Sequence, residues 1–256
     1  MKKYILLFIF LLFLFSCGTF QNDVYLESQL KKAMLSGKVI TEEGLPLEGV
    51  RVRLNAVTET KTDISGRFFF TYIAYGKYNM IFEKEDFLTE EYNLDFKFKN
   101  RKTASVIKVK MLSTNYLVNE GFELLKEKKF KDAKDIIDKL EKINPDEDTF
   151  LYLKATYFYL NSDFSNAEAL LEKLELRDRK NIYYQLTLYD VYEKLELFDK
   201  MADLAFYIGS NNPKDYFEYL KKAADIYKDK LKNEKDANKA LSEYNKYSGK
   251  YGGKSQ

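Results

Sequence analysis

Histidine and tryptophan are absent from this 256-residue chain, which also has one cysteine and three prolines. Without histidine, the chain lacks the commonest general base and the commonest zinc ligand. A single cysteine excludes an intramolecular disulfide framework and a metal site built from several thiolates. No nucleophile-elbow or phosphate-loop motif occurs either. We therefore predict a non-enzymatic protein with no catalytic residues, no metal site and no cofactor.

An excess of charge of either sign is also missing. The chain has 42 basic and 40 acidic residues, and if Lys2 and Lys3 leave with a signal peptide the numbers become equal (42 − 2 against 40). A formal charge near zero argues against nucleic acid as the natural partner. Hydrophobic residues make up 45% and charged residues 32% of the chain, which is typical of a folded body rather than of disorder.

The amino terminus lacks an apolar run long enough to cross a bilayer. Lys2 and Lys3 precede an apolar stretch from Tyr4 to Phe15, whereas a spanning helix needs about 20 apolar residues. Such a short run after positive charges indicates a signal peptide over residues 1–16. The alternative interpretation is an uncleaved membrane anchor with an incidental cysteine.

The segment Leu14-Phe15-Ser16-Cys17 resembles a bacterial lipoprotein box. The resemblance implies that Cys17 is acylated, carries diacylglycerol and becomes the mature amino terminus, with residues 17–34 forming the lipidated cysteine and its tether. Gly18 stands where an aspartate would, in some bacteria, signal retention in the inner membrane. The resemblance therefore implies a lipid-anchored protein of the cell envelope, with the outer membrane favoured.

Residues 35–112 show the period-two alternation of strands with one buried face. The alternating apolar sets are Val50, Val52 and Leu54; Tyr78, Met80 and Phe82; and Ile107, Val109 and Met111. Glycine-containing turn signals separate the strands, at Gly44, at Gly66 and at Gly76. Several short strands at this spacing predict a small β-sandwich.

The order of these turns resembles the carboxypeptidase regulatory-like domain, a transthyretin-like sandwich whose members are mostly non-catalytic accessory modules. Within it, Asp63, Ser65 and Gly66 could form a calcium loop, but we favour a turn in which Asp63 caps backbone N–H groups and Gly66 has a positive φ. Phe69 is expected either to be exposed or to pack on the helical domain.

A repeat of 34 residues follows the sandwich. Phe130, Phe164 and Phe198 are spaced by that interval (164 − 130 and 198 − 164), and Pro145 and Pro213 are two intervals apart. A fixed period of this length is typical of stacked helical hairpins. Small or apolar residues recur where the two helices of a hairpin should cross: Gly121 and Ala155 in one slot, and Ala133, Ala167 and Met201 in another.

This pattern resembles the tetratricopeptide repeat. It departs from that family in having no tryptophan, with Tyr189 in the small slot and Arg179 in place of a proline. The predicted units are 114–147, 148–181 and 182–215 with a capping pair at 216–247, all within a helical domain of residues 113–247, and a disordered tail at 248–256. The expected helices are 115–127, 131–143, 148–160, 165–176, 182–195, 199–209, 215–232 and 235–247.

The resemblance implies that the first helix of each hairpin faces a concave groove. The predicted partner-binding residues in that groove are Asn119, Phe122, Tyr152, Thr156, Tyr159, Tyr183 and Asp190. Tyrosine suits an adaptable binding surface because it buries a large area with little loss of entropy. The alternative interpretation is that these tyrosines pack on neighbouring repeats.

The predicted fold class is α+β in separate domains, a small β-sandwich followed by an all-α array of helical hairpins. The predicted function is a membrane-anchored interaction scaffold whose groove binds a segment of a cell-envelope protein. The alternative is a carbohydrate-contacting accessory lipoprotein of a glycan uptake or cell-wall system, for which Phe69 or Tyr72 would form an exposed sugar platform.

Overall fold

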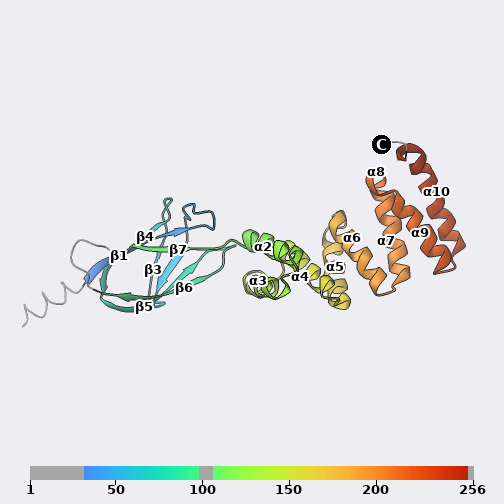
Figure 1. Ribbon diagram of the computed structural model, residues 1–256. Coiled ribbons are helices and arrows are strands. Elements are labelled where there is room, and N and C mark those ends of the chain that lie inside the picture. The colour runs from blue at the N-terminus through green and yellow to red at the C-terminus, as the bar shows by residue number, and fades with distance from the viewer. Residues whose placement is uncertain (1–31, 98–105, 253–256) are drawn as a thin grey trace, which may run out of the picture. The chain divides into compact units, whose positions relative to one another are not determined.

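The computed structural model describes residues 32–97 and 106–252, which divide into two compact units (Figure 1). The boundary falls between Tyr116 and Leu117. We call the part before it the sheet unit and the part after it the helical unit. The predicted fold class, a small sandwich followed by an all-α array of hairpins, is confirmed. The predicted signal peptide, Cys17 and most of the tether lie outside the described residues.

The described part of the sheet unit forms two sheets (Figure 1). One has the order β4-β1-β7, with β1 antiparallel to β4 and parallel to β7. The other has the order β3-β2-β5-β6 and is antiparallel throughout. The strands are β1 Lys32–Ile40, β2 Arg51–Leu54, β3 Thr58–Lys61, β4 Arg67–Ala74, β5 Gly76–Glu83, β6 Glu90–Phe96 and β7 Val106–Lys110.

One apolar core joins the two sheets. It takes alternate residues of both, such as Leu35 and Phe68 from the first and Val52 and Phe82 from the second. The rings of Phe68 and Phe82 meet edge to face with their centroids 5.6 Å apart. The apolar side chains that alternate along each strand all lie on its inner face, and the two inner faces pack together as a sandwich.

The turn before β4 is the capping turn that the sequence predicts. The Asp63 carboxylate accepts hydrogen bonds from the N–H groups of Ser65, at 2.8 Å, and Arg67, at 2.9 Å. Gly66 has a φ of +72° and donates its N–H to the Asp63 carbonyl. Hydrogen bonds to its ionised form hold the pKa of the Asp63 carboxyl below its usual value, with that from the Arg67 N–H contributing most.

The helical unit contains paired helices along the whole of its described length (Figure 1). None of the helices in residues 32–97 and 106–252 combines the length and the apolar character that crossing a membrane requires. The helices are α2 Thr114–Lys126, α3 Phe130–Ile143, α4 Asp148–Leu160, α5 Phe164–Arg177, α6 Ile182–Lys194, α7 Phe198–Asn211, α8 Pro213–Tyr216, α9 Glu218–Asp229 and α10 Glu234–Tyr251.

The three repeated phenylalanines begin the second helix of each hairpin. Phe130, Phe164 and Phe198 are the first residues of α3, α5 and α7. The residue two positions earlier has a positive φ in each case, at Lys128, Ser162 and Glu196. At each turn the next N–H, for example that of Lys129, bonds to a carbonyl five residues back, here Leu124. This is the Schellman ending of a helix, made without glycine.

The small slots are buried, because the helices meet there. Ala133 and Ala167 have no exposed surface, and a Cβ built on Gly121 would lie 2.6 Å from Leu153 Cδ2. Tyr189 occupies a small slot and is only 6% exposed. Its ring meets that of Tyr219 edge to face at 5.1 Å, so the third hairpin accommodates a large residue by packing it against α9.

The last part of the array differs from the prediction in two places. In place of one helix over residues 215–232, the structure has the short α8 and then α9. The predicted disordered tail at 248–256 is wrong at its start, because α10 continues to Tyr251 and Tyr251 stacks on Tyr247 with ring centroids 6.2 Å apart. Residues 253–256 lie outside the described residues.

Candidate functional site

The predicted partner-binding residues lie on the first helices of the hairpins, α2, α4 and α6, whose common side we call the groove face. The structure distributes them from exposed to half-buried, with Tyr183 the most open at 68% exposure. Asn119 and Asp190 are also exposed, whereas Phe122, Tyr152, Thr156 and Tyr159 are half-buried.

Tyr152 joins three helices of the groove face. Its ring lies 5.8 Å from that of Phe122 on α2 and 5.1 Å from that of Tyr184 on α6, centroid to centroid. Its hydroxyl is 3.0 Å from that of Thr187. Tyr152 therefore packs on both neighbouring repeats, as the alternative interpretation of these tyrosines has it.

The hydroxyl of Thr156 is also used within the array. It donates to the Tyr152 carbonyl at 2.8 Å, as the hydroxyl of Thr187 donates to the Tyr183 carbonyl at 2.9 Å. These are bonds to the preceding helical turn. What remains available to a partner is the ring of Tyr183, the half-buried ring of Tyr159, the polar group of Asn119 and the carboxylate of Asp190.

Asp190 lies on α6, where Glu193, Lys194 and Lys222 act on its carboxyl group. Partial withdrawal from water raises the pKa of its carboxyl, Glu193 raises it further, and Lys222 and Lys194 oppose the shift. The same surroundings act on the tyrosines. Burial, followed by the charge of Glu193, raises the pKa of Tyr189 to about 12.

We predict that Asp190→Asn stabilises the helical unit at neutral pH. A carboxyl whose pKa is higher in the folded chain than in the unfolded chain opposes folding once it is ionised, and an amide removes that cost. The advantage of the variant should therefore be full above the folded pKa and should vanish as the pH falls toward the unfolded pKa. Urea unfolding midpoints measured across that acidic range would show it.

Asp146→Asn is the control with the opposite sign. Hydrogen bonds from Lys173 and then from Arg177 lower the pKa of Asp146. Its ionised form therefore stabilises the fold above the unfolded pKa, and that contribution is lost as the pH falls through the folded pKa. The asparagine variant should be the less stable protein at neutral pH. If the urea unfolding midpoints of Asp190→Asn and the wild type changed in parallel with pH, the pKa of Asp190 would not be raised by folding.

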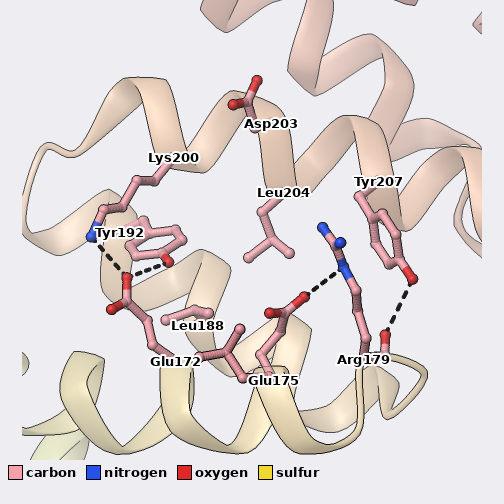
Figure 2. A pocket seen from close by; sticks show the side chains of 10 residues that line it. Glu172, Glu175, Arg179, Leu188, Tyr192, Lys200, Asp203, Leu204 and Tyr207 are labelled. Atoms are coloured by element: carbon pink, nitrogen blue, oxygen red, sulfur yellow. Dashed lines mark hydrogen bonds and ion pairs between the residues drawn. The ribbon is translucent and has the colours of Figure 1, made fainter.

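A second candidate site lies between α5 and α7, with α6 behind it (Figure 2). Its cavity has a volume of about 350 Å³. It is lined by leucines, tyrosines and charged residues, namely Glu172, Glu175, Leu176, Arg179, Leu188, Tyr192, Lys200, Asp203, Leu204 and Tyr207. We refer to it as the α5–α7 pocket; the sequence reasoning missed it.

Four of the five charged side chains that line the α5–α7 pocket form two ion pairs (Figure 2). Lys200 Nζ lies 2.7 Å from Glu172 Oε1, and Arg179 Nε lies 3.0 Å from Glu175 Oε1. The Tyr192 hydroxyl donates to Glu172 at 2.9 Å, and burial followed by that bond raises the pKa of Tyr192. The pocket thus offers a partner ring faces, aliphatic surface and the carboxylate of Asp203, which forms no ion pair among the described residues and accepts a hydrogen bond from the Tyr227 hydroxyl.

One signal for this pocket was present in the sequence. Lys200 on α7 pairs with Glu168 and Glu172 on α5, close to one repeat length away. Such pairs connect successive repeats. Within residues 32–97 and 106–252, no three acidic, cysteine or histidine side chains come together in a way that could hold a metal ion.

No family model matches the chain, and no curated protein does. The chain is similar to solved structures of MamA. One MamA crystal structure matches with a TM-score of 0.47 and 14% identity, over 56% of this chain and 77% of that one. MamA 41-end from Desulfovibrio magneticus RS-1 matches with a TM-score of 0.44 and 15% identity, over 54% and 77%.

A different structure, a type II cohesin-X-dockerin complex from Acetivibrio cellulolyticus, matches 32% of this chain and 58% of that one, with a TM-score of 0.24 and 20% identity. Likenesses this distant say nothing about what the present chain binds. The functional proposal therefore rests on the side chains of the groove face.

Proposed function

We propose that this protein is a lipid-anchored, non-catalytic interaction scaffold of the cell envelope, and that its groove face binds a segment of a protein partner. The anchor in this proposal is Cys17, and the outer membrane is the favoured location. The support for the anchor comes from the lipoprotein box in the sequence.

The observation that carries the binding proposal is an exposed ring beside a cluster of packed aromatic rings. Tyr183 is 68% exposed on α6, next to Tyr184, which is 7% exposed and packs on Tyr152. Hot spots of protein interfaces are typically large aromatic side chains held on well-packed surroundings. Packing against one another fixes the neighbouring rings before a partner arrives, which lowers the entropy that binding must overcome.

The alternative function, carbohydrate contact, has a weaker basis. Phe69 is 46% and Tyr72 is 77% exposed, so each could meet a sugar. One cavity in the described part of the sheet unit lies over the other sheet, where charged side chains of β2 and β5 line it, among them Arg51, Arg53 and Glu83. Charged side chains do not form the flat aromatic platform on which a sugar would stack. We therefore favour the function of an interaction scaffold.

The test is capture of the partner from detergent-solubilised membranes by the full chain. Truncation of Tyr159 and Tyr183 together to alanine should weaken capture by about 2 kcal/mol if they are hot spots. We choose these two and not Tyr152, because removing the Tyr152 ring would also disturb the stacking of three helices. Tyr152→Phe, which keeps the ring, should bind almost as well as the wild type.

Tyr207→Ala in the α5–α7 pocket is the matched control, since it removes a half-buried tyrosine from another face. Its capture should equal that of the wild type. Loss of capture in Tyr207→Ala with full capture by the double variant would move the binding site to the pocket. Full capture of the partner by every variant would refute binding at both the groove face and the α5–α7 pocket.

A further inference from the structure

The outer side of the sheet β4-β1-β7 carries two parallel rows of side chains. Phe69, Ser36 and Val106 are directly paired across the three strands and form one row. Arg67, Lys38 and Lys108 are paired in the same way and form the next row. We call these the apolar row and the basic row.

Both rows point away from the sandwich core. The residues that alternate with them, such as Leu35, Phe68 and Ile107, are buried in that core. Side chains directly opposite each other on neighbouring strands lie on the same face of a sheet. Neighbouring strands are about 4.8 Å apart, so each row presents its three side chains within roughly 10 Å.

The basic row forms no ion pair among the described residues, although Arg67 and the Asp63 carboxylate attract each other electrostatically. Lys38, Arg67 and Lys108 make no ion pair within residues 32–97 and 106–252, and neither does Lys110, which follows Lys108 on the same face. The Asp63 carboxylate, held ionised by hydrogen bonds within its turn, offsets part of the charge of Arg67 and leaves Lys38 and Lys108 without an ion-pair partner among the described residues. Like charges directly opposite each other destabilise a sheet, so an anionic surface against this row would relieve the repulsion.

The apolar row lies beside the basic row. Phe69 is 46% and Val106 is 70% exposed, and Met34, two residues before Ser36 on β1, is 48% exposed. Exposed apolar side chains next to unpaired lysine and arginine are typical of surfaces that bind anionic membranes. The apolar groups enter the boundary between headgroups and acyl chains, and the cations meet the phosphates.

The chain reaches this face from its amino terminus. β1 begins at Lys32, so Met34 lies near the end of β1 that follows residues 18–31, and the apolar row at Ser36 is closer to that end than the basic row at Lys38. Those residues connect β1 to Cys17, the proposed site of the lipid. At about 3.5 Å per residue, fully extended, they reach at most ~50 Å, so an anchored chain holds this sheet close to a bilayer.

We propose that the outer face of β4-β1-β7 docks on an anionic lipid surface, with the apolar row in the interface and the basic row on the headgroup phosphates. This docking rests on the proposed anchoring at Cys17, which supplies the proximity. It adds to the anchor a contact that orients the sheet unit on the membrane.

The absence of tryptophan from the chain gives a direct test. Phe69→Trp in the full, acylated chain places a single tryptophan in the apolar row. The protein is reconstituted into vesicles of phosphatidylcholine with or without phosphatidylglycerol, each with brominated acyl chains. The fluorescence of this tryptophan should be quenched and blue-shifted in the vesicles containing phosphatidylglycerol, and far less so in those of phosphatidylcholine. Added salt should weaken the effect, because it screens exposed charges.

Two controls separate docking from mere proximity. Val57→Trp puts the reporter in the turn between β2 and β3 of the other sheet, where Val57 is 88% exposed, and should stay unquenched. Lys38→Glu with Lys108→Glu should abolish the quenching seen in Phe69→Trp, because each cation near an anionic surface contributes about fivefold in affinity. Lys61→Glu with Lys77→Glu makes the same change in net charge on the other sheet and should leave the quenching intact.

Flotation of the vesicles reports the anchor separately from the docking. A Phe69→Trp chain that remains in the aqueous fraction would overturn the anchoring and the docking together. A chain that floats with its tryptophan unquenched would overturn the docking alone. Equal quenching in vesicles with and without phosphatidylglycerol would also overturn the docking. So would equal quenching in the Lys38→Glu/Lys108→Glu and Lys61→Glu/Lys77→Glu variants, since the basic row would then have no role.

Discussion

Gly66→Ala should destabilise the sheet unit by about 3 kcal/mol or more. Gly66 has a φ of +72°, a conformation that costs an L residue about 1–2 kcal/mol. A Cβ added there would lie 2.4 Å from the Val39 carbonyl oxygen and 3.0 Å from Leu47 N. Both are backbone atoms, which cannot rotate away, so the chain must shift at an overpacking cost of about 1–3 kcal/mol.

Gly44→Ala is the matched control for this prediction. Gly44 also has a positive φ, +86°, but an added Cβ there meets nothing within 4 Å. It should lose only the conformational part, about 1 kcal/mol. Urea unfolding followed by circular dichroism would give both values, and hydrogen exchange would show which unit opens. Equal losses for the two variants would mean that the close approach at Gly66 contributes nothing.

The capping turn shows what a sequence can predict. Asp63, Ser65 and Gly66 make the turn through bonds among neighbours in the chain, so their order alone indicates it. The distance of Gly66 from the Val39 carbonyl depends on how the turn packs on a strand far away in sequence. No local pattern encodes that distance.

The hairpins of the helical unit were predictable for a similar reason. A 34-residue period in phenylalanine and small residues repeats one local packing arrangement, and α3, α5 and α7 begin at those phenylalanines. The positive φ of Lys128, Ser162 and Glu196 could not be predicted, because lysine, serine and glutamate rarely adopt it. There the helix ending is imposed by the packing of the two helices.

The candidate binding residues show more clearly what a sequence cannot predict. Tyr183 and Tyr184 are neighbours on α6, yet one is 68% and the other 7% exposed. Sequence reasoning placed Tyr152 and Tyr183 in one groove, whereas the structure shows the Tyr152 ring packed between those of Phe122 and Tyr184. Which tyrosine stacks depends on the rotation of each helix within the array, and a rotation of one residue exchanges the two.

Gly209 is a second glycine whose role depends on packing. The predicted helix stops at residue 209, but α7 continues to Asn211 and passes close to the start of α9. A Cβ on Gly209 would lie 2.7 Å from Leu220 Cγ and 2.9 Å from Leu220 N. The missing side chain lets the two helices approach, as small residues do elsewhere in the array.

Gly209→Val should therefore destabilise the helical unit by about 3 kcal/mol, at the top of the range for overpacking, since its neighbours include the α9 backbone. The better helix propensity of valine offsets only about 0.4 kcal/mol of that. Gly249→Val is the control, because Gly249 lies within α10 with nothing within 4 Å of an added Cβ. It should be neutral or slightly stabilising. Urea unfolding should measure the loss of stability, and hydrogen exchange should locate it in α7 and α9. Similar effects of Gly209→Val and Gly249→Val would mean that α7 and α9 do not need the close approach at Gly209.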